Sequence, residues 1–184
     1  IIVDMQNDYA HPEGAYGKSG ADLQPVHNII SNLKRLIDAA HKAGVMVVFT
    51  RNWKTPWHMS KVSTDQATKS DSSIGPNGIA NTWGADWFEV KPSDQDIVIN
   101  KRRYDAFIGT DLDQILRAQR VETVVIAGIQ TNVCVESTAR SAFMRDYYVV
   151  VLEDATATVS EAIHRASLDH LANYFGDVVA GNHV

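Results

Sequence analysis

Short runs rich in valine and isoleucine recur along the chain, and most of them are followed by a stretch with helical periodicity. The runs span residues 1–3, 45–50, 97–100, 123–127 and 149–152, with a shorter sixth candidate at 177–180. They are apolar almost without interruption, which is typical of strands covered on both faces. Helical patterns occupy residues 27–43, 110–120, 133–146 and 160–174. This alternation predicts a three-layer α/β/α fold around a parallel sheet with right-handed crossovers.

Residues 51–95 are the exception, because this stretch has no clear strand pattern and at most short helices. A connection of this length in a compact domain usually has a function. All four tryptophans of the chain lie in it, namely Trp53, Trp57, Trp83 and Trp87. We expect one domain over residues 1–184, with this Trp-rich segment as a lid over a pocket, as a subunit interface, or as both.

Composition and charge exclude several classes of protein. The formal net charge is −5 and no dense run of lysine and arginine occurs, which argues against nucleic acid as a partner. No apolar run is long enough to span a bilayer, so no membrane partner is expected. The single cysteine, Cys134, rules out an internal disulfide and favours a reducing, cytoplasmic location.

Cys134 follows the fourth predicted strand, where a helix is expected to begin. The free amide groups and positive dipole of a helix start lower the pKa of a thiol. The same amides can stabilise the oxyanion that forms when a thiolate attacks a carbonyl group. The alternative is that Cys134 is a small apolar residue packed in the core.

Two further reactive side chains follow predicted strands: Asp4 comes after the first and Lys101 after the third. Open parallel sheets bind ligands beyond the carboxyl ends of their strands, so these side chains can meet Cys134 there. Asp4 would take the thiol proton and pass it to a leaving nitrogen, while Lys101 would keep Asp4 ionised or support developing negative charge. The alternatives are a turn aspartate and a solvated lysine.

Four motifs give the chain a resemblance to the isochorismatase-like cysteine hydrolase family over nearly its whole length. They are DMQNDY at residues 4–9, KRRYDAF at 101–107, GIQTNVCVEST at 128–138 and VLEDAT at 151–156. The resemblance implies a six-stranded parallel sheet with helices on both faces. It also implies a catalytic triad of Asp4, Lys101 and Cys134.

The resemblance further implies a cis peptide bond that does not involve proline, between Ile129 and Gln130. In the family this bond turns an amide N–H toward the substrate oxygen. The oxyanion hole is therefore expected to consist of the backbone N–H groups of Gln130 and Cys134.

Nicotinamidases of this family bind a metal through an Asp-x-His group after the second strand. The corresponding stretch here is Asn52-Trp53-Lys54. A neutral amide and a cation are poor ligands for a divalent ion, so we expect no catalytic metal and no cofactor.

Several side chains near these motifs are candidates for substrate contact, either as neutral amides, as flat apolar walls or as a partner for a carboxylate. They are Asn52, Trp53, Arg103, Tyr104, Phe107 and Gln130. Aromatic side chains at such positions commonly pack in the core instead. Gln6 is expected to order the aspartate or a backbone turn rather than touch substrate.

The motifs are most similar to those of ureidoacrylate amidohydrolases. The leading prediction is a cytoplasmic, homo-oligomeric hydrolase that uses water and a thioester to cleave a C–N bond in a small linear ureido or carbamoyl compound. One alternative is an isochorismatase-type or nicotinamidase-type hydrolase. A second is a catalytically silent binding or assembly protein.

Overall fold

A six-stranded parallel sheet forms the centre of the protein in the computed structural model, which describes residues 1–69 and 74–181. The strands are β1 (Ile2–Val3), β2 (Val48–Asn52), β3 (Ile97–Lys101), β4 (Thr123–Ile129), β5 (Tyr148–Ala157) and β6 (Asp177–Val179). They are arranged in the order β3-β2-β1-β4-β5-β6, and every neighbouring pair is parallel. The predicted fold class is therefore confirmed.

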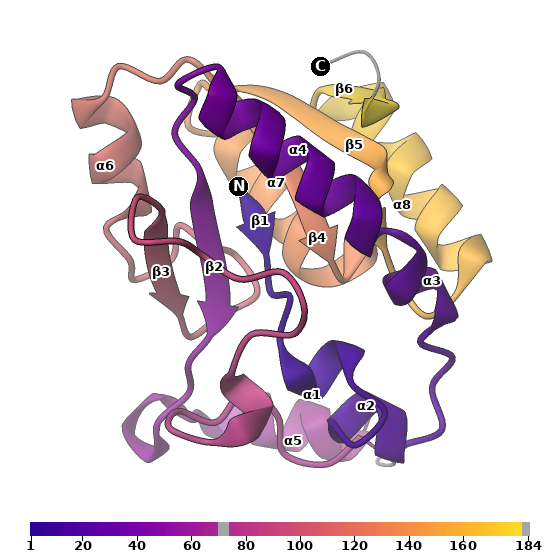
Figure 1. Ribbon diagram of the computed structural model, residues 1–184. Helices are drawn as coiled ribbons and strands as arrows, with labels where there is room; N and C mark the ends of the chain where they lie inside the picture. The colour runs from indigo at the N-terminus through magenta and orange to yellow at the C-terminus, as the bar shows by residue number, and fades with distance from the viewer. Residues whose placement is uncertain (70–73, 182–184) are drawn as a thin grey trace.

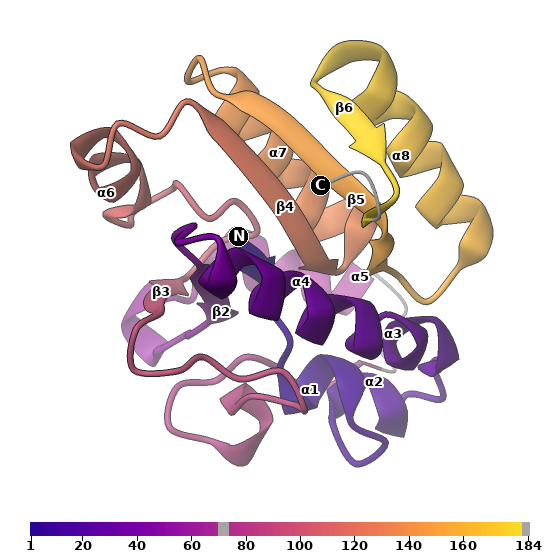
Figure 2. The same cartoon turned by 45° about the horizontal axis from the view of Figure 1, so that its top comes forward.

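Helices cover both faces of the sheet (Figures 1 and 2). Helices α3 (Gln24–Asn28) and α4 (Ile30–Lys42) lie on one face, whereas α6 (Leu112–Ala118), α7 (Glu136–Phe143) and α8 (Glu161–Tyr174) lie on the other. Each face has its own apolar cluster: Phe49, Leu33 and Ile37 belong to the α4 side. Ile126 and Leu168 belong to the cluster of α6, α7 and α8.

Three elements depart from the sequence pattern. The helix predicted at 27–43 is broken at Ile29 into α3 and α4. The helix predicted at 133–146 starts instead with a π-type turn, η3 (Thr131–Val135), before α7. Strand β5 continues past Leu152 to Ala157, because its polar second half still pairs with the end of β4 across a register shift. The sequence pattern did not predict this extension, because polar residues interrupt the apolar run after Leu152.

The Trp-rich segment lies at the carboxyl edge of the sheet with the short helices α1 (Asn7–Ala10), α2 (Ala15–Lys18) and α5 (Lys61–Lys69) (Figure 1). It also holds the 3-10 turns η1 (Pro56–His58) and η2 (Trp83–Ala85). Trp87 packs edge-on against Phe49, with ring centroids 5.6 Å apart. Trp57 is 93% exposed and Trp83 is 50% exposed. Whether the segment acts as a lid or as an interface stays a prediction.

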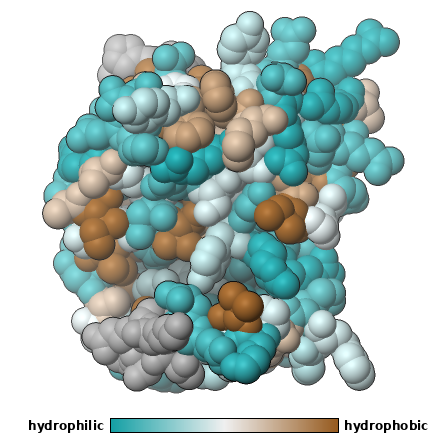
Figure 3. All heavy atoms as spheres, turned by 180° about the vertical axis from the view of Figure 1, so that it is seen from behind, coloured by the Kyte–Doolittle hydropathy of each residue, from teal (hydrophilic) through white to brown (hydrophobic). Residues whose placement is uncertain are grey.

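Figure 3 shows apolar side chains on the rear face as separate patches among hydrophilic ones. Within the part of the chain that is described, no helix combines the length and the apolarity needed to cross a membrane.

Candidate active site

Asp4, Lys101 and Cys134 meet in one buried group at the carboxyl edge of the sheet. Lys101 Nζ lies 2.7 Å from Asp4 Oδ2 and 3.2 Å from Cys134 Sγ. Asp4 follows β1, Lys101 ends β3 and Cys134 lies in η3 just after β4. The parallel topology brings their strand ends to one edge, and the lysine stem crosses the end of β2 to reach the other two.

The backbone and two neighbours on β2 fix the carboxylate of Asp4. Asp4 adopts a left-handed conformation with φ of 51°, which turns the chain sharply out of the sheet. The Thr50 hydroxyl donates to Oδ1 at 3.0 Å, and the Asn52 amide donates to Oδ2 at 2.8 Å. The side chain of Asp4 is 1% exposed, so these donors and Lys101 replace the water that a free carboxylate would bind.

Lys101 is fully buried, and its ammonium group has four polar partners among the described residues. Besides Asp4 and Cys134, Nζ donates to Asn52 Oδ1 at 3.2 Å and to the Arg103 carbonyl at 3.1 Å. Burial by itself lowers the pKa of Lys101, but the charges and hydrogen bonds of Asp4 and Cys134 outweigh it and raise the pKa above its usual value. Lys101 is therefore a fixed cation between the carboxylate and the sulfur.

The surroundings of Cys134 favour the protonated thiol. Burial raises the pKa of Cys134 to about 12; Lys101 opposes the shift, and Asp4 adds to it. The expectation that the helix start lowers this pKa is wrong here, because desolvation of a side chain that is 6% exposed outweighs the favourable dipole. A thiol of this kind needs a base during attack, and the candidate is the carboxylate of Asp4, which shares the ammonium group of Lys101 with the sulfur.

The turn that carries Cys134 begins with the predicted cis peptide bond, Ile129–Gln130, which is confirmed. The carbonyl of Gln130 accepts the N–H groups of Val133 and Val135, at 3.1 and 3.2 Å. The N–H of Gln130 itself has no acceptor among the residues that the structure describes. Its side chain is buried, and neither polar atom of the carboxamide has a partner there.

Gly128 lets β4 approach β1 at this point. Its φ is +112°, and an added Cβ would lie 2.2 Å from the carbonyl oxygen of Val3. Only glycine tolerates both the conformation and the contact, so this residue sets the distance between the strand ends that carry Asp4 and Cys134.

Comparison with known proteins places this geometry in a family. The model of the isochorismatase domain matches residues 1–182. The chain belongs to the isochorismatase domain family. It is 38% identical to the ureidoacrylate amidohydrolase RutB of Yersinia enterocolitica over 190 residues, covering 96% of this chain and 82% of the relative.

Solved structures agree with that assignment. A cysteine hydrolase from Pseudomonas syringae pv. phaseolicola superposes with a TM-score of 0.85 at 29% identity, covering 99% of this chain and 87% of the other. The N-carbamoylsarcosine amidase of Thermoplasma acidophilum superposes with a TM-score of 0.78 at 26% identity, covering 100% and 95%. The resemblance stated from the motifs is confirmed.

This isochorismatase domain does not fit a divalent metal at the end of β2. The oxygen of Asn52 already accepts from Lys101, and its nitrogen donates to Asp4. Lys54 presents an ammonium group, which repels a cation. Among the described residues, no three histidine, cysteine, aspartate or glutamate side chains are grouped as metal ligands.

The candidate substrate contacts occupy different environments. Asn52 lies within the triad, with Nδ2 4.0 Å from Cys134 Sγ. Trp53 stacks under the guanidinium group of Arg51, whose Cζ is 3.8 Å from the ring centroid. Phe107 is buried and stacks on Tyr147, with centroids 6.0 Å apart, which is the contact of a core residue.

Tyr104 is 56% exposed, and Arg103 is exposed and donates to the His58 carbonyl at 3.1 Å. No contact with a substrate is tested for any of these side chains, so each stays a prediction. Gln6 orders the backbone as expected: its side chain accepts the N–H of Asn52 at 2.7 Å and donates to the carbonyls of Asn52 and Ala85.

Sequence reasoning missed two supports of the site. The hydroxyl of Thr50 donates a hydrogen bond to the carboxylate of Asp4. The sequence hint for this role was a polar residue at the end of an apolar run. His164 on α8 contacts the hydroxyl of Thr131 through Nδ1 at 2.9 Å and so anchors the turn before Cys134. That contact spans two distant segments, and no local pattern reveals it.

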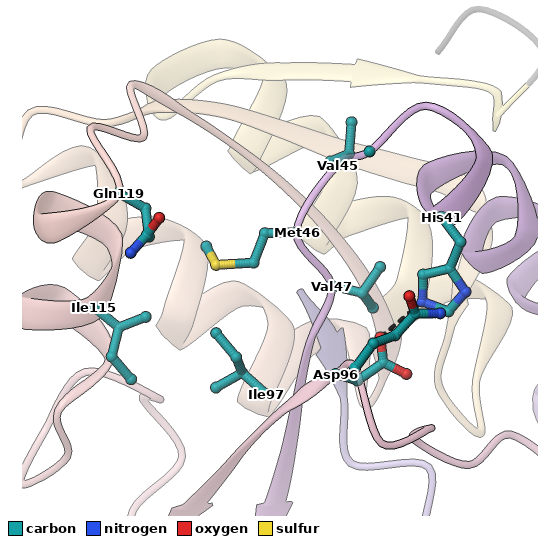
Figure 4. A pocket seen from close by; sticks show the side chains of 10 residues that line it. His41, Val45, Met46, Val47, Asp96, Ile97, Ile115 and Gln119 are labelled. Carbon is teal, nitrogen blue, oxygen red and sulfur yellow. Dashed lines mark hydrogen bonds and ion pairs between the residues drawn. The ribbon is translucent and has the colours of Figure 1, made fainter.

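A separate hollow of about 400 Å³ lies at the opposite, amino-terminal edge of β2 and β3. Figure 4 shows Met46 in its centre, Ile115 and Gln119 on one side and His41 beside Asp96 on the other. His41 Nε2 lies 2.7 Å from Asp96 Oδ1, so these two polar groups are paired with each other. Asp4, Lys101 and Cys134 lie at the other end of these strands, so this hollow is separate from the candidate active site.

Proposed function

We propose that this chain hydrolyses a C–N bond in a small linear ureido or carbamoyl compound, with ureidoacrylate as the leading substrate. The chain is a cysteine amidohydrolase of the isochorismatase family. The observation that carries the proposal is the contact of Lys101 Nζ with both Asp4 and the sulfur of Cys134, at 2.7 and 3.2 Å, in a water-excluding site. Nucleophile, base and fixed cation are thereby assembled as acyl transfer requires.

In the proposed reaction, Asp4 takes the thiol proton as Sγ forms a bond to the substrate carbonyl carbon. The backbone N–H groups of Gln130 and Cys134 stabilise the oxyanion. The C–N bond then breaks, and the nitrogen leaves with the proton that Asp4 held. Asp4 next deprotonates a water molecule that hydrolyses the thioester and restores the thiol. For a ureido substrate, the carbamate product loses CO2 to give an amine.

Lys101 and Asn52 keep the base competent through this cycle. Lys101 compensates the charge of Asp4 before proton transfer and contacts the sulfur that bears charge in the thiolate. Asn52 bridges the same carboxylate, at 2.8 Å, and the lysine, at 3.2 Å. Both act through charge and position, and neither has to exchange a proton.

The preference for a ureido or carbamoyl group is supported by Gln130. Its buried carboxamide offers a donor and an acceptor that no described residue satisfies. An unpaired buried amide costs about 1–3 kcal/mol, which a complementary urea group in the pocket would offset. The name of the Yersinia enterocolitica relative points to the same substrate class.

Steady-state hydrolysis of ureidoacrylate, with ammonia as the readout, tests the proposal. Cys134→Ala and Cys134→Ser are expected to lose at least about a thousandfold in kcat, because alanine has no nucleophile and a serine hydroxyl is a much weaker one than the thiolate. Unchanged circular dichroism and melting temperature are the control for folding. Full activity of Cys134→Ala contradicts the covalent route, and release of pyruvate from isochorismate without ammonia release from ureido compounds contradicts the proposed class.

We also propose that the chain acts as one catalytic domain in a cytoplasmic homo-oligomer. Exposure of Trp57 at 93%, Val62 at 79% and Trp83 at 50% supports an interface on the Trp-rich segment. A reactive lone thiol suits a reducing compartment. Light scattering of the purified chain measures the oligomeric mass, and a monomer at micromolar concentration contradicts the assembly.

A further inference from the structure

Lys54 is a second cation close to the triad, and the proposed chemistry does not use it. Its backbone extends the line of β2: the N–H of Lys54 donates to Gly78 O and its carbonyl accepts from Ala80, both at 2.8 Å. These bonds form a parallel bridge to Ile79 and keep the backbone extended beyond Asn52. Side chains alternate in extended backbone, so Lys54 shares the side of Asn52.

The side chain of Asn52 points into the triad, where Nδ2 lies 2.8 Å from Asp4 Oδ2 and 4.0 Å from Cys134 Sγ. Residues two apart on a strand are separated by about 7 Å. Trp53, between them, points the other way and stacks with Arg51. The backbone of Lys54 is therefore about 7 Å along the strand from Asn52, and its ammonium group is close enough to the triad for the charges of Lys101, Cys134 and Asp4 to act on it.

No carboxylate pairs with Lys54 within the described part of the chain. Nζ donates to two neutral oxygens of Asn77, the backbone carbonyl at 3.2 Å and Oδ1 at 3.1 Å. The nearby carboxylate of Asp8 instead accepts the N–H of Gly78 at 2.8 Å. Other lysines with described ion pairs, such as Lys34 and Lys61, pair with carboxylates at the surface.

This half-buried ammonium has lost much of its water without gaining a counter-ion. Burial and the nearby charge of Lys101 lower the pKa of Lys54, and the negative groups around it offset only part of that shift. An anion that entered here would form a charge-assisted hydrogen bond in a site of low dielectric.

We propose that Lys54 binds a carboxylate of the substrate and makes this enzyme selective for ureido or carbamoyl acids over neutral ureido amides. The assignment rests on the proposed function, because it places the ureido carbonyl at Cys134 and the acid group a few bonds away. Without substrate, the oxygens of Asn77 occupy the donors of Lys54. The substrate carboxylate replaces them, and Asn77 keeps its bond from the hydroxyl of Tyr9.

Matched substrates on the intact enzyme test the assignment. The wild type, Lys54→Met and Lys54→Arg are each assayed with 3-ureidoacrylate and with its neutral analogue 3-ureidoacrylamide. Lys34→Met, which removes a surface lysine on α4, is the control for net charge. We expect the wild type to favour the acid by about tenfold or more in kcat/KM, since a charged hydrogen bond is worth that much or more.

In Lys54→Met, KM for the acid is expected to rise about 10- to 100-fold with kcat nearly unchanged, because the contact is made to a part of the substrate that does not react. KM for the neutral analogue changes less than about twofold. Lys54→Arg retains most of the preference for the acid. Lys34→Met behaves as the wild type with both substrates.

Equal losses for both substrates in Lys54→Met overturn the assignment and indicate a structural role for Lys54. If Lys54→Met does not fold, the test uses the ratio of kcat/KM for the acid to kcat/KM for the neutral analogue in the wild type and in Lys54→Arg. If neither protein prefers the acid, the assignment is overturned. If the wild type hydrolyses neither compound, the proposed function itself fails, and that outcome is distinct from a ureido hydrolase that is indifferent to charge.

Discussion

At the scale of single residues, the reactivity of Cys134 depends on competition between burial and charge. The start of a helix and the ammonium of Lys101 favour the thiolate, whereas loss of water favours the neutral thiol. Burial dominates and raises the pKa of Cys134 to about 12. In the proposed mechanism, the nucleophile therefore forms only as the thiol proton moves to Asp4.

Alkylation of the free enzyme by iodoacetamide is expected to accelerate by about tenfold per pH unit between about pH 7 and about pH 10, because the thiolate fraction rises in that way below the pKa. Mass spectrometry of the peptide that contains Cys134 measures the rate. A plateau near neutral pH would show a preformed thiolate, which would contradict the raised pKa.

At the scale of elements, helix α8 holds the turn that carries Cys134. The turn η3 is closed by a hydrogen bond from the N–H of Val135 to the carbonyl of Gln130, which spans one residue more than the bonds of an α-helix. Such π-type turns are common at functional sites. His164 of α8 fixes its first residue through the Thr131 hydroxyl, and Ser167 of the same helix contacts both the Thr131 carbonyl and Glu136. Helix α8 thus positions the backbone that presents Cys134.

His164→Gln is expected to destabilise the fold by about 1–3 kcal/mol at pH 7.5, because it disturbs a buried hydrogen bond. Burial lowers the pKa of His164, and the charge of Arg165 lowers it further, while Glu161 and Glu153 offset only part of the shift. The wild type therefore has this residue's full contribution to stability above the unfolded pKa of about 6.5 and loses it as the pH falls toward the folded value.

Urea unfolding of both proteins at a series of pH values measures the difference. The stability gap between the wild type and His164→Gln should narrow as the pH falls below about 6.5. A stability gap that is constant with pH would show that the pKa of His164 is the same in the folded and unfolded states.

At the scale of the whole molecule, the Asp4–Lys101 pair links β1 to β3 across the end of β2. The pair is buried, with side chains 1% and 0% exposed. Thr50 and Asn52 on the intervening strand bond to it, so three strand ends share one polar network. The network assembles only when the sheet is complete, and the active site therefore forms together with the fold.

Lys101→Met is expected to lower the free energy of unfolding by about 3–5 kcal/mol, since it leaves the carboxylate of Asp4 buried without its cation. The double variant Asp4→Asn with Lys101→Met is expected to regain most of that loss and to remain inactive, because it lacks both charge and base. Chemical denaturation and the ammonia assay measure the two properties separately. Additive losses in the double variant would show that the two residues do not interact.

The sequence predicted the order and type of the main elements, five parallel strands with a candidate sixth, and the identity of the residues at their carboxyl ends. It did so because continuous apolar runs and helical periodicity are local patterns. It also predicted the Ile129–Gln130 cis bond, through resemblance to the family.

Tertiary structure alone decided the state of the thiol, the role of Thr50 and His164, and the position of Lys54 beside the triad. Burial, hydrogen bonds across strands and the distance between charges depend on which distant segments meet. A pattern along the chain does not contain those distances, which is why the sequence predicted a lowered thiol pKa where the packed sheet raises it.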